Sequence, residues 1–406
     1  MKLLIAKRLV VPLGYRDFRL LWIGQAISAL GNPFQVVAVA WLVLQLKGSA
    51  LDLANIMLAL TIPQAVVTLA GGVLIDRLDA RTVMLWSDTV RTITSGTIAL
   101  LAFTGSLPLW LLCIILLFHS AANGLFNPAA MSIPPHLVPK ENLDSANSLM
   151  QLISQLGTFL GAVPAGLLIA SYGPAIAFAL NSLSFAVAVL ATLLMTPLRH
   201  AIRDQKSSVF DDAQQGFAYL RSFPWLITLL LVDTFAAIAA IGPTAIGLPL
   251  LARNTLHVGA QGYSLLIWSF GVGSIIGMVL PGMFSPRHHR GRFFCLIQII
   301  EAPLLAAIAF TPLPIAMFCL ASVGLLNGFL VILFLSLLQA NIAKEMTGRI
   351  MSLFMLASVG FVPFSQYASG IIANAAGIQV LFISTGVLTM LGAVLGLLVP
   401  SLRRLD

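Results

Sequence analysis

The sequence predicts an all-α membrane protein of twelve transmembrane helices, arranged as two pseudo-symmetric six-helix bundles. Hydrophobic residues make up 59% of the 406-residue chain and charged residues only 9%, and the mean hydropathy is +0.99. This composition leaves too few polar side chains to cover a water-soluble protein of this length. Apolar stretches recur from residue 18 to residue 399 between short polar breaks, which is the pattern of a chain that crosses a membrane many times.

Each apolar stretch is long enough for one crossing, because a hydrocarbon core of about 30 Å requires roughly 20 helical residues. The first apolar run, residues 9–13, is too short for a signal peptide and no small-residue cleavage pattern follows it, so the first span is expected to be retained. The spans are predicted near residues 18–46, 51–75, 82–103, 107–133, 143–170, 174–196, 223–251, 261–284, 293–311, 313–342, 347–372 and 376–399.

The basic residues indicate how the chain is oriented. They concentrate in both tails and in alternate loops, whereas the opposite loops hold only Lys47 and Arg253. By the positive-inside rule, both termini and the 197–222 connection are predicted to be cytoplasmic, which requires an even number of spans. Since the net charge of +8 is spread over these loops and forms no single cluster, no nucleic-acid partner is expected.

The sequence contains no signature of an enzyme, a metal site or a nucleotide-driven pump. It has no GxxxxGK[ST] loop, no HExxH motif and no glycine-rich strand-to-helix turn. Its three cysteines, Cys113, Cys295 and Cys319, lie singly in apolar runs without metal-binding spacing. We therefore expect no cofactor and no enzymatic activity.

The two halves of the chain repeat each other. A shift of 204 positions brings Asn123-Gly124 onto Asn327-Gly328 and Gly173 onto Gly377 without a gap. The longest polar segment lies midway, so the predicted organisation is an N-terminal bundle (1–196), a cytoplasmic linker (197–222) and a C-terminal bundle (223–406). Six spans per half give both halves the same orientation, as in one large class of secondary transporters.

A short motif between the second and third spans points to a family. Residues 72–81 read Gly-Val-Leu-Ile-Asp-Arg-Leu-Asp-Ala-Arg, which resembles the cytoplasmic loop signature of the major facilitator superfamily. Phe-Arg-Leu-Leu-Trp at 18–22, Phe-Asn-Pro at 126–128 and Asn-Ser-Leu-Ser-Phe at 181–185 resemble its branch of bacterial exporters, similar to macrolide-efflux and siderophore-export proteins. The resemblance covers essentially the whole chain and implies a bacterial inner-membrane protein that works as a monomer.

The resemblance also implies a conformational latch at this loop. Asp76 would face the start of the eleventh span, near residues 347–349, and stabilise the outward-facing state. A solvated positive-inside loop is the alternative. Asp88 and Arg91, spaced i and i+3 on the third span, are predicted to form an intrahelical ion pair or to support the latch. The latch residues are therefore Gly72, Asp76, Arg77, Arg81, Asp88 and Arg91.

Two acids lie deep within predicted spans, where ionisable side chains are costly and mark function. Asp233 is about eight residues into the seventh span, and Glu301 is at a similar depth in the ninth. The seventh span lines the central cavity in the resembling family, so Asp233 is the better candidate for a proton or cationic-substrate site. A structural role within its half is the alternative for each acid.

The spans that line the cavity in the resembling family also carry amides and one histidine. A buried amide hydrogen-bonds a ligand or a neighbouring helix equally well. Many relatives have an acid at the position of Asn32, so coupling charges are missing from the first half; His119 could replace them or could be a packing residue. The remaining candidates for the substrate or proton pathway are Gln25, Gln35, Asn123, Asn127 and Asn327.

These features predict a secondary transporter that exports an amphipathic or hydrophobic small molecule, by proton antiport with alternating access. Its partners would be that substrate, protons and membrane lipids. Two alternatives stay open: a lipid or lysophospholipid flippase on the same scaffold, and a receptor-like membrane protein that does not transport.

Overall fold

The computed structural model describes residues 10–75, 79–197, 217–284, 288–403 and 405. Throughout these ranges the chain is predominantly helical and contains no β-strand, so the predicted all-α fold is confirmed. The chain divides into two compact units: unit 1 consists of residues 1–48 and 55–204, and unit 2 of residues 49–54 and 205–406. Most of the predicted linker, at 198–216, lies outside the described residues.

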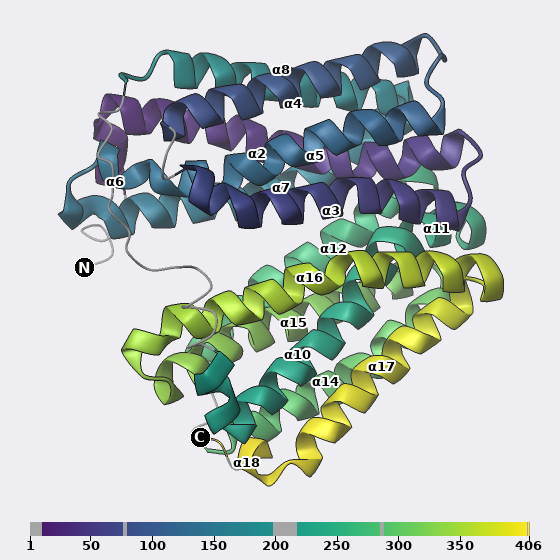
Figure 1. The fold of residues 1–406 in the computed structure, drawn as a ribbon. Coiled ribbons are helices and arrows are strands. Elements are labelled where there is room, and N and C mark those ends of the chain that lie inside the picture. Colours follow the sequence, from purple (N-terminus) through teal and green to yellow (C-terminus); the bar gives the residue numbers. More distant parts are fainter. Residues whose placement is uncertain (1–9, 76–78, 198–216, 285–287, 404, 406) are drawn as a thin grey trace. The chain divides into compact units, whose positions relative to one another are not determined.

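The long helices begin and end within a few residues of the predicted spans (Figure 1). In the first half these are α2 (Arg16–Gln45), α3 (Ala50–Ile75), α4 (Ala80–Phe103), α5 (Leu109–Ser132), α7 (Leu143–Tyr172) and α8 (Pro174–Leu193), with the short α6 (Pro134–Leu137). In the second half they are α10 (Pro224–Gly242), α12 (Gly259–Val279), α14 (Arg290–Ala307), α15 (Leu313–Asn341), α16 (Lys344–Ala376) and α17 (Ile378–Leu398), with the short α13 (Pro281–Phe284) and α18 (Pro400–Arg403).

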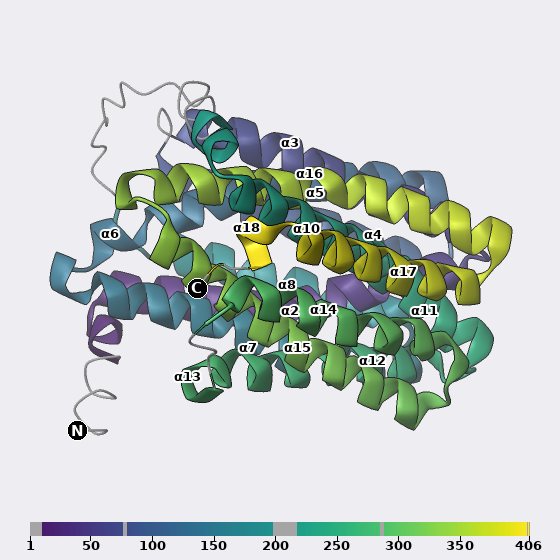
Figure 2. The same ribbon diagram turned by 90° about the horizontal axis from the view of Figure 1, so that it is seen from below.

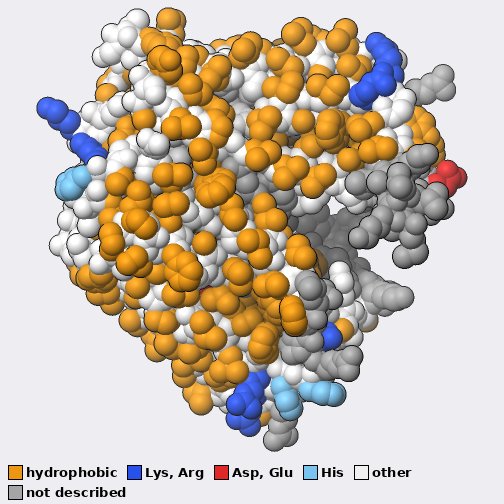
Figure 3. Space-filling view, turned by 180° about the vertical axis from the view of Figure 1, so that it is seen from behind, with side chains coloured by type: hydrophobic (Ala, Val, Ile, Leu, Met, Phe, Trp, Pro, Cys, Tyr) orange, Lys and Arg blue, Asp and Glu red, His pale blue; other side chains and the backbone are white. Residues whose placement is uncertain are grey.

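The surface of these helices suits a lipid environment. Within the described part of the chain, nine helical segments are long and apolar enough to cross a membrane, and α4, α7 and α16 occupy the other three predicted positions. Large side chains such as Trp86, Phe318 and Phe364 are exposed. Hydrophobic side chains cover most of the face shown in Figure 3, and Lys and Arg lie near its edges. Such a surface would be a liability in water but is appropriate to the hydrocarbon of a bilayer.

The seventh predicted span is longer and less regular than expected. After α10 the chain continues through a π-helical segment (Pro243–Gly247), a single turn α11 (Leu248–Leu250) and a second π-helical segment (Leu251–Thr255). Pro243 and Pro249 lack the backbone N–H that a regular α-helix would use, which is one reason the register widens here. Hydropathy reveals the length of a span but not this change of register.

The internal repeat reappears in the way corresponding helices end. Gly173 ends α7 with φ +81°, and Gly377 ends α16 with φ +90°; the two are related by the shift of 204 positions seen in the sequence. In both places the next helix, α8 or α17, begins at the following residue. A side chain with a Cβ would strain this left-handed backbone, so glycine is the residue expected at both corners.

Helices α12 and α15 of unit 2 approach each other through four glycines. Gly273 and Gly277 on α12 and Gly324 and Gly328 on α15 form two facing GxxxG motifs. A Cβ at Gly277 would collide with the backbone carbonyl of Leu325, and the other three meet the backbone of the opposite helix in the same way. Small residues that let two backbones meet are a main means of holding helices together in a bilayer, where no hydrophobic driving force separates helix from lipid.

We expect Gly277→Ala to weaken the α12–α15 contact, because the new methyl group would push against backbone and not against a flexible side chain. The yield of monodisperse protein and its midpoint of thermal unfolding in detergent should both fall. Gly360→Ala on α16 is the matched control, since a Cβ there meets nothing within 4 Å. Equal effects of the two substitutions would contradict this account of the interface.

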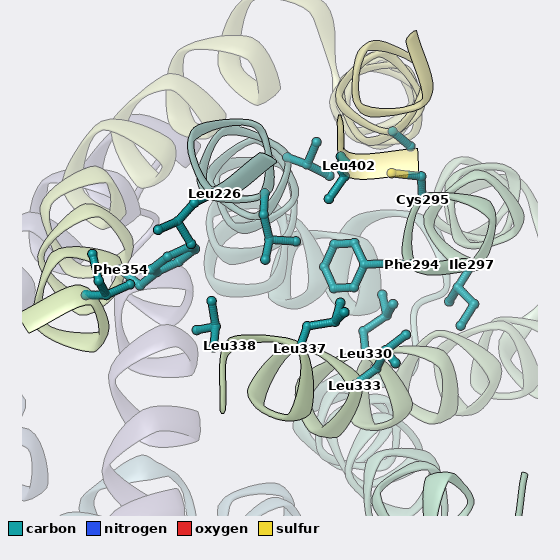
Figure 4. Close-up of a cluster of buried hydrophobic side chains, with 14 of the residues drawn as sticks. Leu226, Phe294, Cys295, Ile297, Leu330, Leu333, Leu337, Leu338, Phe354 and Leu402 are labelled. Atoms are coloured by element: carbon teal, nitrogen blue, oxygen red, sulfur yellow. The ribbon is translucent and has the colours of Figure 1, made fainter. Parts of the chain in front are cut away.

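A second part of unit 2 is held by apolar side chains from several helices (Figure 4). Leu226 of α10, Phe294 of α14, Leu337 of α15 and Leu402 of α18 are completely or almost completely buried in this cluster. Helices α14 and α17 lie side by side in Figures 1 and 2. This packing fixes the part of α14 that carries Glu301.

Candidate functional site

The interior of unit 1 contains a buried ion pair. Nη1 of Arg91 lies 2.9 Å from Oδ1 of Asp88 one turn earlier on α4, as their spacing predicts. Both side chains are buried, with 0% of Asp88 and 3% of Arg91 exposed. The Arg91 guanidinium carbon lies 3.9 Å from the ring centroid of Phe185 on α8 and 4.6 Å from that of Phe126 on α5. The cation is therefore held by one carboxylate and two aromatic faces.

His119 lies next to this pair. Its Nδ1 is 2.9 Å from the hydroxyl of Thr94, which is one turn after Arg91 on α4, and its ring centroid is 5.8 Å from that of Phe185. The side chain is only 6% exposed. Phe185 thus contacts both Arg91 and His119. This arrangement favours the packing role of His119 that the sequence left open, because the ring is enclosed by α4, α5 and α8.

A cluster of amides and hydroxyls continues the polar interior toward α2. Oε1 of Gln35 accepts hydrogen bonds from Nδ2 of Asn181 at 2.9 Å and from the hydroxyl of Ser95 at 3.3 Å. The buried Nε2 of Gln35 has no hydrogen-bond partner among the residues that the structure describes. Asn181 was not among the predicted site residues. The signal that could have found it is the pair Asn181 and Ser184, two polar residues one turn apart on an apolar helix.

These groups form one polar array that joins four helices of unit 1. Its members are buried and form two hydrogen-bonded groups that meet at the adjacent residues Thr94 and Ser95 of α4, and we call them the polar array: Gln35, Asp88, Arg91, Thr94, Ser95, His119 and Asn181. Buried polar contacts of this kind attach helices to one another inside a bilayer. The array brings together four predicted site residues. The sequence analysis had assigned Gln35 and His119 to the substrate or proton pathway, and Asp88 and Arg91 to the latch.

The other predicted residues of unit 1 lie apart from the polar array. Asn32 on α2 and Asn127 on α5 are exposed, and Gln25 and Asn123 on the same two helices are half-buried. An exposed amide on a membrane-spanning helix requires water, a ligand or another polar surface as its partner. These four amides are therefore better candidates for contact with a substrate than Gln35, which is buried and whose Oε1 is already engaged by Asn181 and Ser95.

The predicted latch lies partly outside the described residues. Asp76 and Arg77 belong to the undescribed stretch 76–78, and Gly72 lies in the last part of α3. Nε and Nη2 of Arg81 donate hydrogen bonds to the backbone carbonyls of Thr192 (3.1 Å) and Leu193 (3.0 Å). Arg81 thus caps the end of α8, where a cation satisfies carbonyl groups that lack partners within the helix.

Two described acids of unit 2, Glu301 and Asp233, lie well inside candidate membrane-spanning segments and not at their ends. Glu301 on α14 is 5% exposed and follows Gln298, which is 2% exposed, by one turn. Asp233 on α10 is half-buried. Within the described residues neither carboxylate forms an ion pair, in contrast to Asp88. Asn327 on α15 is half-buried as well.

Glu301 lies where α14 and α17 pack closely. A Cβ at Gly386 on α17 would lie 2.6 Å from the backbone carbonyl of Ala302. The facing helix also buries Thr385 and Thr389, whose hydroxyls donate to carbonyls of α17 itself. The backbone next to Glu301 is therefore packed tightly against α17, and the buried position of Glu301 is costly for an unpaired charge.

Asp233 lies on α10, and a side chain from α16 binds the backbone near the end of that helix. The hydroxyl of Ser365 on α16 accepts a hydrogen bond from the backbone N–H of Gly242 at 2.9 Å and donates one to the carbonyl of Ile238. These two groups, four residues apart, are the pair that a regular α-helix joins directly. The π-helical segment begins at the next residue, Pro243, so Ser365 marks the point at which α10 becomes irregular.

A family model and several known proteins match this chain over nearly its whole length. The model of the transmembrane secretion effector family matches residues 9–406. Macrolide efflux protein A of Streptococcus pyogenes is 26% identical over 397 residues, covering 96% of this chain and 97% of that protein. The multidrug efflux pump Tap of Mycolicibacterium fortuitum is 25% identical over 392 residues, covering 93% of this chain and 94% of its own length.

Solved structures show the same fold at lower sequence identity. The nucleoside transporter NupG superposes with a TM-score of 0.75 at 14% identity, covering 94% of this chain and 98% of that chain. A bacterial homologue of the human lysosomal transporter Spinster, inward-facing and unoccupied, superposes with a TM-score of 0.73 at 15% identity, covering 96% and 98%. At such identities the agreement concerns the architecture of the chain and not its substrate.

Proposed function

The chain belongs to the transmembrane secretion effectors of the major facilitator superfamily, and from this membership we propose that it exports an amphipathic or hydrophobic small molecule in exchange for protons. Export is supported by relatives named as macrolide and multidrug efflux proteins, which match almost the whole chain. We place the protein in the inner membrane of a bacterium, as a monomer with both termini in the cytoplasm. The movement would be alternating access by two six-helix bundles joined at 197–222.

One observation carries the proposal of proton coupling. Asp233 and Glu301 lie within membrane-spanning segments of unit 2, and neither forms an ion pair with any described residue. A carboxylate that is not neutralised by a fixed cation can exchange a proton as its surroundings change. Asp88 is unsuited to this role because Arg91 already binds it. Of the two free acids we assign coupling to Asp233, because it is the more exposed.

The exposed or half-buried amides support a substrate with little net charge. Asn32, Asn127, Gln25 and Asn123 offer both hydrogen-bond donors and acceptors without a formal charge. Apolar walls with a few amides are typical of sites for weakly polar ligands. The latch belongs to the same proposal, with Arg81 of α4 bound to the backbone carbonyls at the end of α8. Its residues are Gly72, Asp76, Arg77, Arg81, Asp88 and Arg91.

Transport in proteoliposomes tests this proposal. Purified protein would be reconstituted, a pH gradient imposed, and accumulation of labelled drugs, siderophores and lysophospholipids measured. We expect at least one amphipathic compound to accumulate only when the gradient is present, and a protonophore to abolish the accumulation. Transport at the same rate with and without the pH gradient would overturn proton antiport. Transport of lysophospholipids alone would favour lipid translocation.

A further inference from the structure

A long groove lies on the surface of unit 1 along α4 and α5. It consists of a cavity of about 560 Å³, which Val67 of α3 also lines, and a smaller one of about 240 Å³; the two share Val90 and Phe118 as lining residues. We call the two together the α4–α5 groove. From its shape and chemistry we propose that it binds one acyl chain of a bilayer phospholipid. This site is independent of the transport proposed above.

The groove runs along the helix axis and not across it. Its lining residues on α4 recur every three or four positions, at Thr82, Trp86, Val90, Ile93 and Thr97, and so lie on one face of the helix. From residue 79 to residue 97 this face extends over roughly 27 Å at 1.5 Å per residue. The hydrocarbon core of a bilayer is about 30 Å thick, so the groove parallels the chains of the surrounding lipid over most of that depth.

The groove is mostly apolar, and its one charged lining residue lies at one end. Partway along it, the buried hydroxyl of Ser87 has no hydrogen-bond partner among the described residues. Asp79 and Thr82 lie together at the beginning of α4, where Oδ2 of Asp79 accepts hydrogen bonds from the backbone N–H (3.0 Å) and hydroxyl (2.7 Å) of Thr82. Further along, the hydroxyls of Thr94 and Thr97 donate to carbonyls of their own helix. Trp86 and Phe118, 70% and 64% exposed, flank the groove. One polar end and a long apolar course suit an amphipath with a single extended chain.

The groove suits an acyl chain better than a protein segment. A helix is about 10 Å across, much wider than an acyl chain, and only one row of its side chains could enter the two narrow cavities. An extended peptide would fit the width, but its backbone N–H and C=O groups would have no partners along the apolar walls. An acyl chain has neither difficulty, since it is narrow and contains no group that requires a hydrogen bond.

Photolabelling from within the membrane tests this site. The full-length protein would be reconstituted with a phosphatidylcholine that carries a diazirine in its acyl chain, irradiated and mapped by mass spectrometry. We expect peptides from α4 and α5 to be labelled more than those from the exposed face of α17. Unlabelled phosphatidylcholine should compete for the α4 and α5 label at lower amounts than for the label elsewhere, as a specific site requires.

Groove-filling variants complete the test. Val90→Phe and Ala121→Leu add bulk to the groove from opposite helices, whereas Val387→Phe adds the same bulk as the first at an exposed position on α17. Loss of the α4 and α5 label in the two filled variants, with the α17 label and the unfolding midpoint unchanged, would support the site. Labelling of α4 and α5 at the same level as α17, or retained in both filled variants, would overturn it.

Discussion

Replacing Asp88 by leucine is expected to lower the stability of unit 1 by about 3–5 kcal/mol, because removing one partner of a buried ion pair leaves the other charge uncompensated. Here the stranded charge would be the guanidinium of Arg91, which is 3% exposed and lies between Phe126 and Phe185. The two aromatic faces attract the cation but cannot replace a carboxylate at 2.9 Å. The midpoint of thermal unfolding in detergent micelles reports the loss.

A double variant separates the charge from the shape of the site. Asp88→Leu combined with Arg91→Met replaces both partners by apolar side chains of similar volume, and such replacements are often neutral or stabilising. We expect the double variant to recover most of the stability lost in Asp88→Leu. Asp144→Leu, at an exposed position in the first turn of α7, is the matched control and should shift the midpoint little.

Two results would contradict this account. If Asp88→Leu unfolds at the temperature of the wild-type protein, the ion pair does not stabilise unit 1. If the double variant is as unstable as the single variant, the loss of stability comes from altered packing of the Arg91 side chain against Phe126 and Phe185, and not from the unpaired charge.

The prediction of this ion pair shows what sequence reasoning can reach. Asp88 and Arg91 lie one turn apart on the same helix, so helical geometry alone brings them together. The same is true of the spans themselves, because hydropathy over roughly 20 residues depends only on local sequence. The glycines Gly173 and Gly377 were also visible, since a repeat in sequence leads to a repeat in backbone conformation.

Contacts between distant helices could not be predicted in this way. Gln35 and Asn181 are 146 positions apart, and nothing in either helix indicates that the two amides meet. Ser365 was not expected to interrupt α10, because its role depends on how α16 packs against Ile238 and Gly242. In each case the missing information is which face of one helix meets which face of another, and an apolar sequence with little periodic contrast does not supply it.

The same reasoning explains why the predicted amides separated into two groups. Gln35 and Asn32 lie on one helix at adjacent turns, yet Gln35 points into the bundle and Asn32 is exposed. A spacing of three positions leaves the two side chains only about 60° apart around the helix axis, so the boundary between the buried and exposed faces of α2 falls between them. The amide content of α2 was predictable, and the face on which each amide lies was not.

Replacing Asp233 by asparagine is expected to abolish accumulation driven by a pH gradient. The amide keeps the shape and a hydrogen-bonding carbonyl but cannot carry a proton across the cycle. Exchange of labelled for unlabelled substrate without a gradient should continue, because it requires binding and the conformational cycle but no net proton movement. The two assays in the same proteoliposomes distinguish a coupling residue from one that only holds α10 in place.

Asp144→Asn is the matched control, since it makes the same chemical change at an exposed position on α7. Glu301→Gln tests the second acid under the same conditions. If Glu301→Gln abolishes accumulation and Asp233→Asn does not, the coupling site lies on α14 at Glu301, one turn after Gln298. If both variants accumulate substrate as the wild-type protein does, neither membrane acid couples transport to protons. Because facilitated diffusion does not accumulate a substrate, a titratable group other than these two acids would then have to be the coupling site.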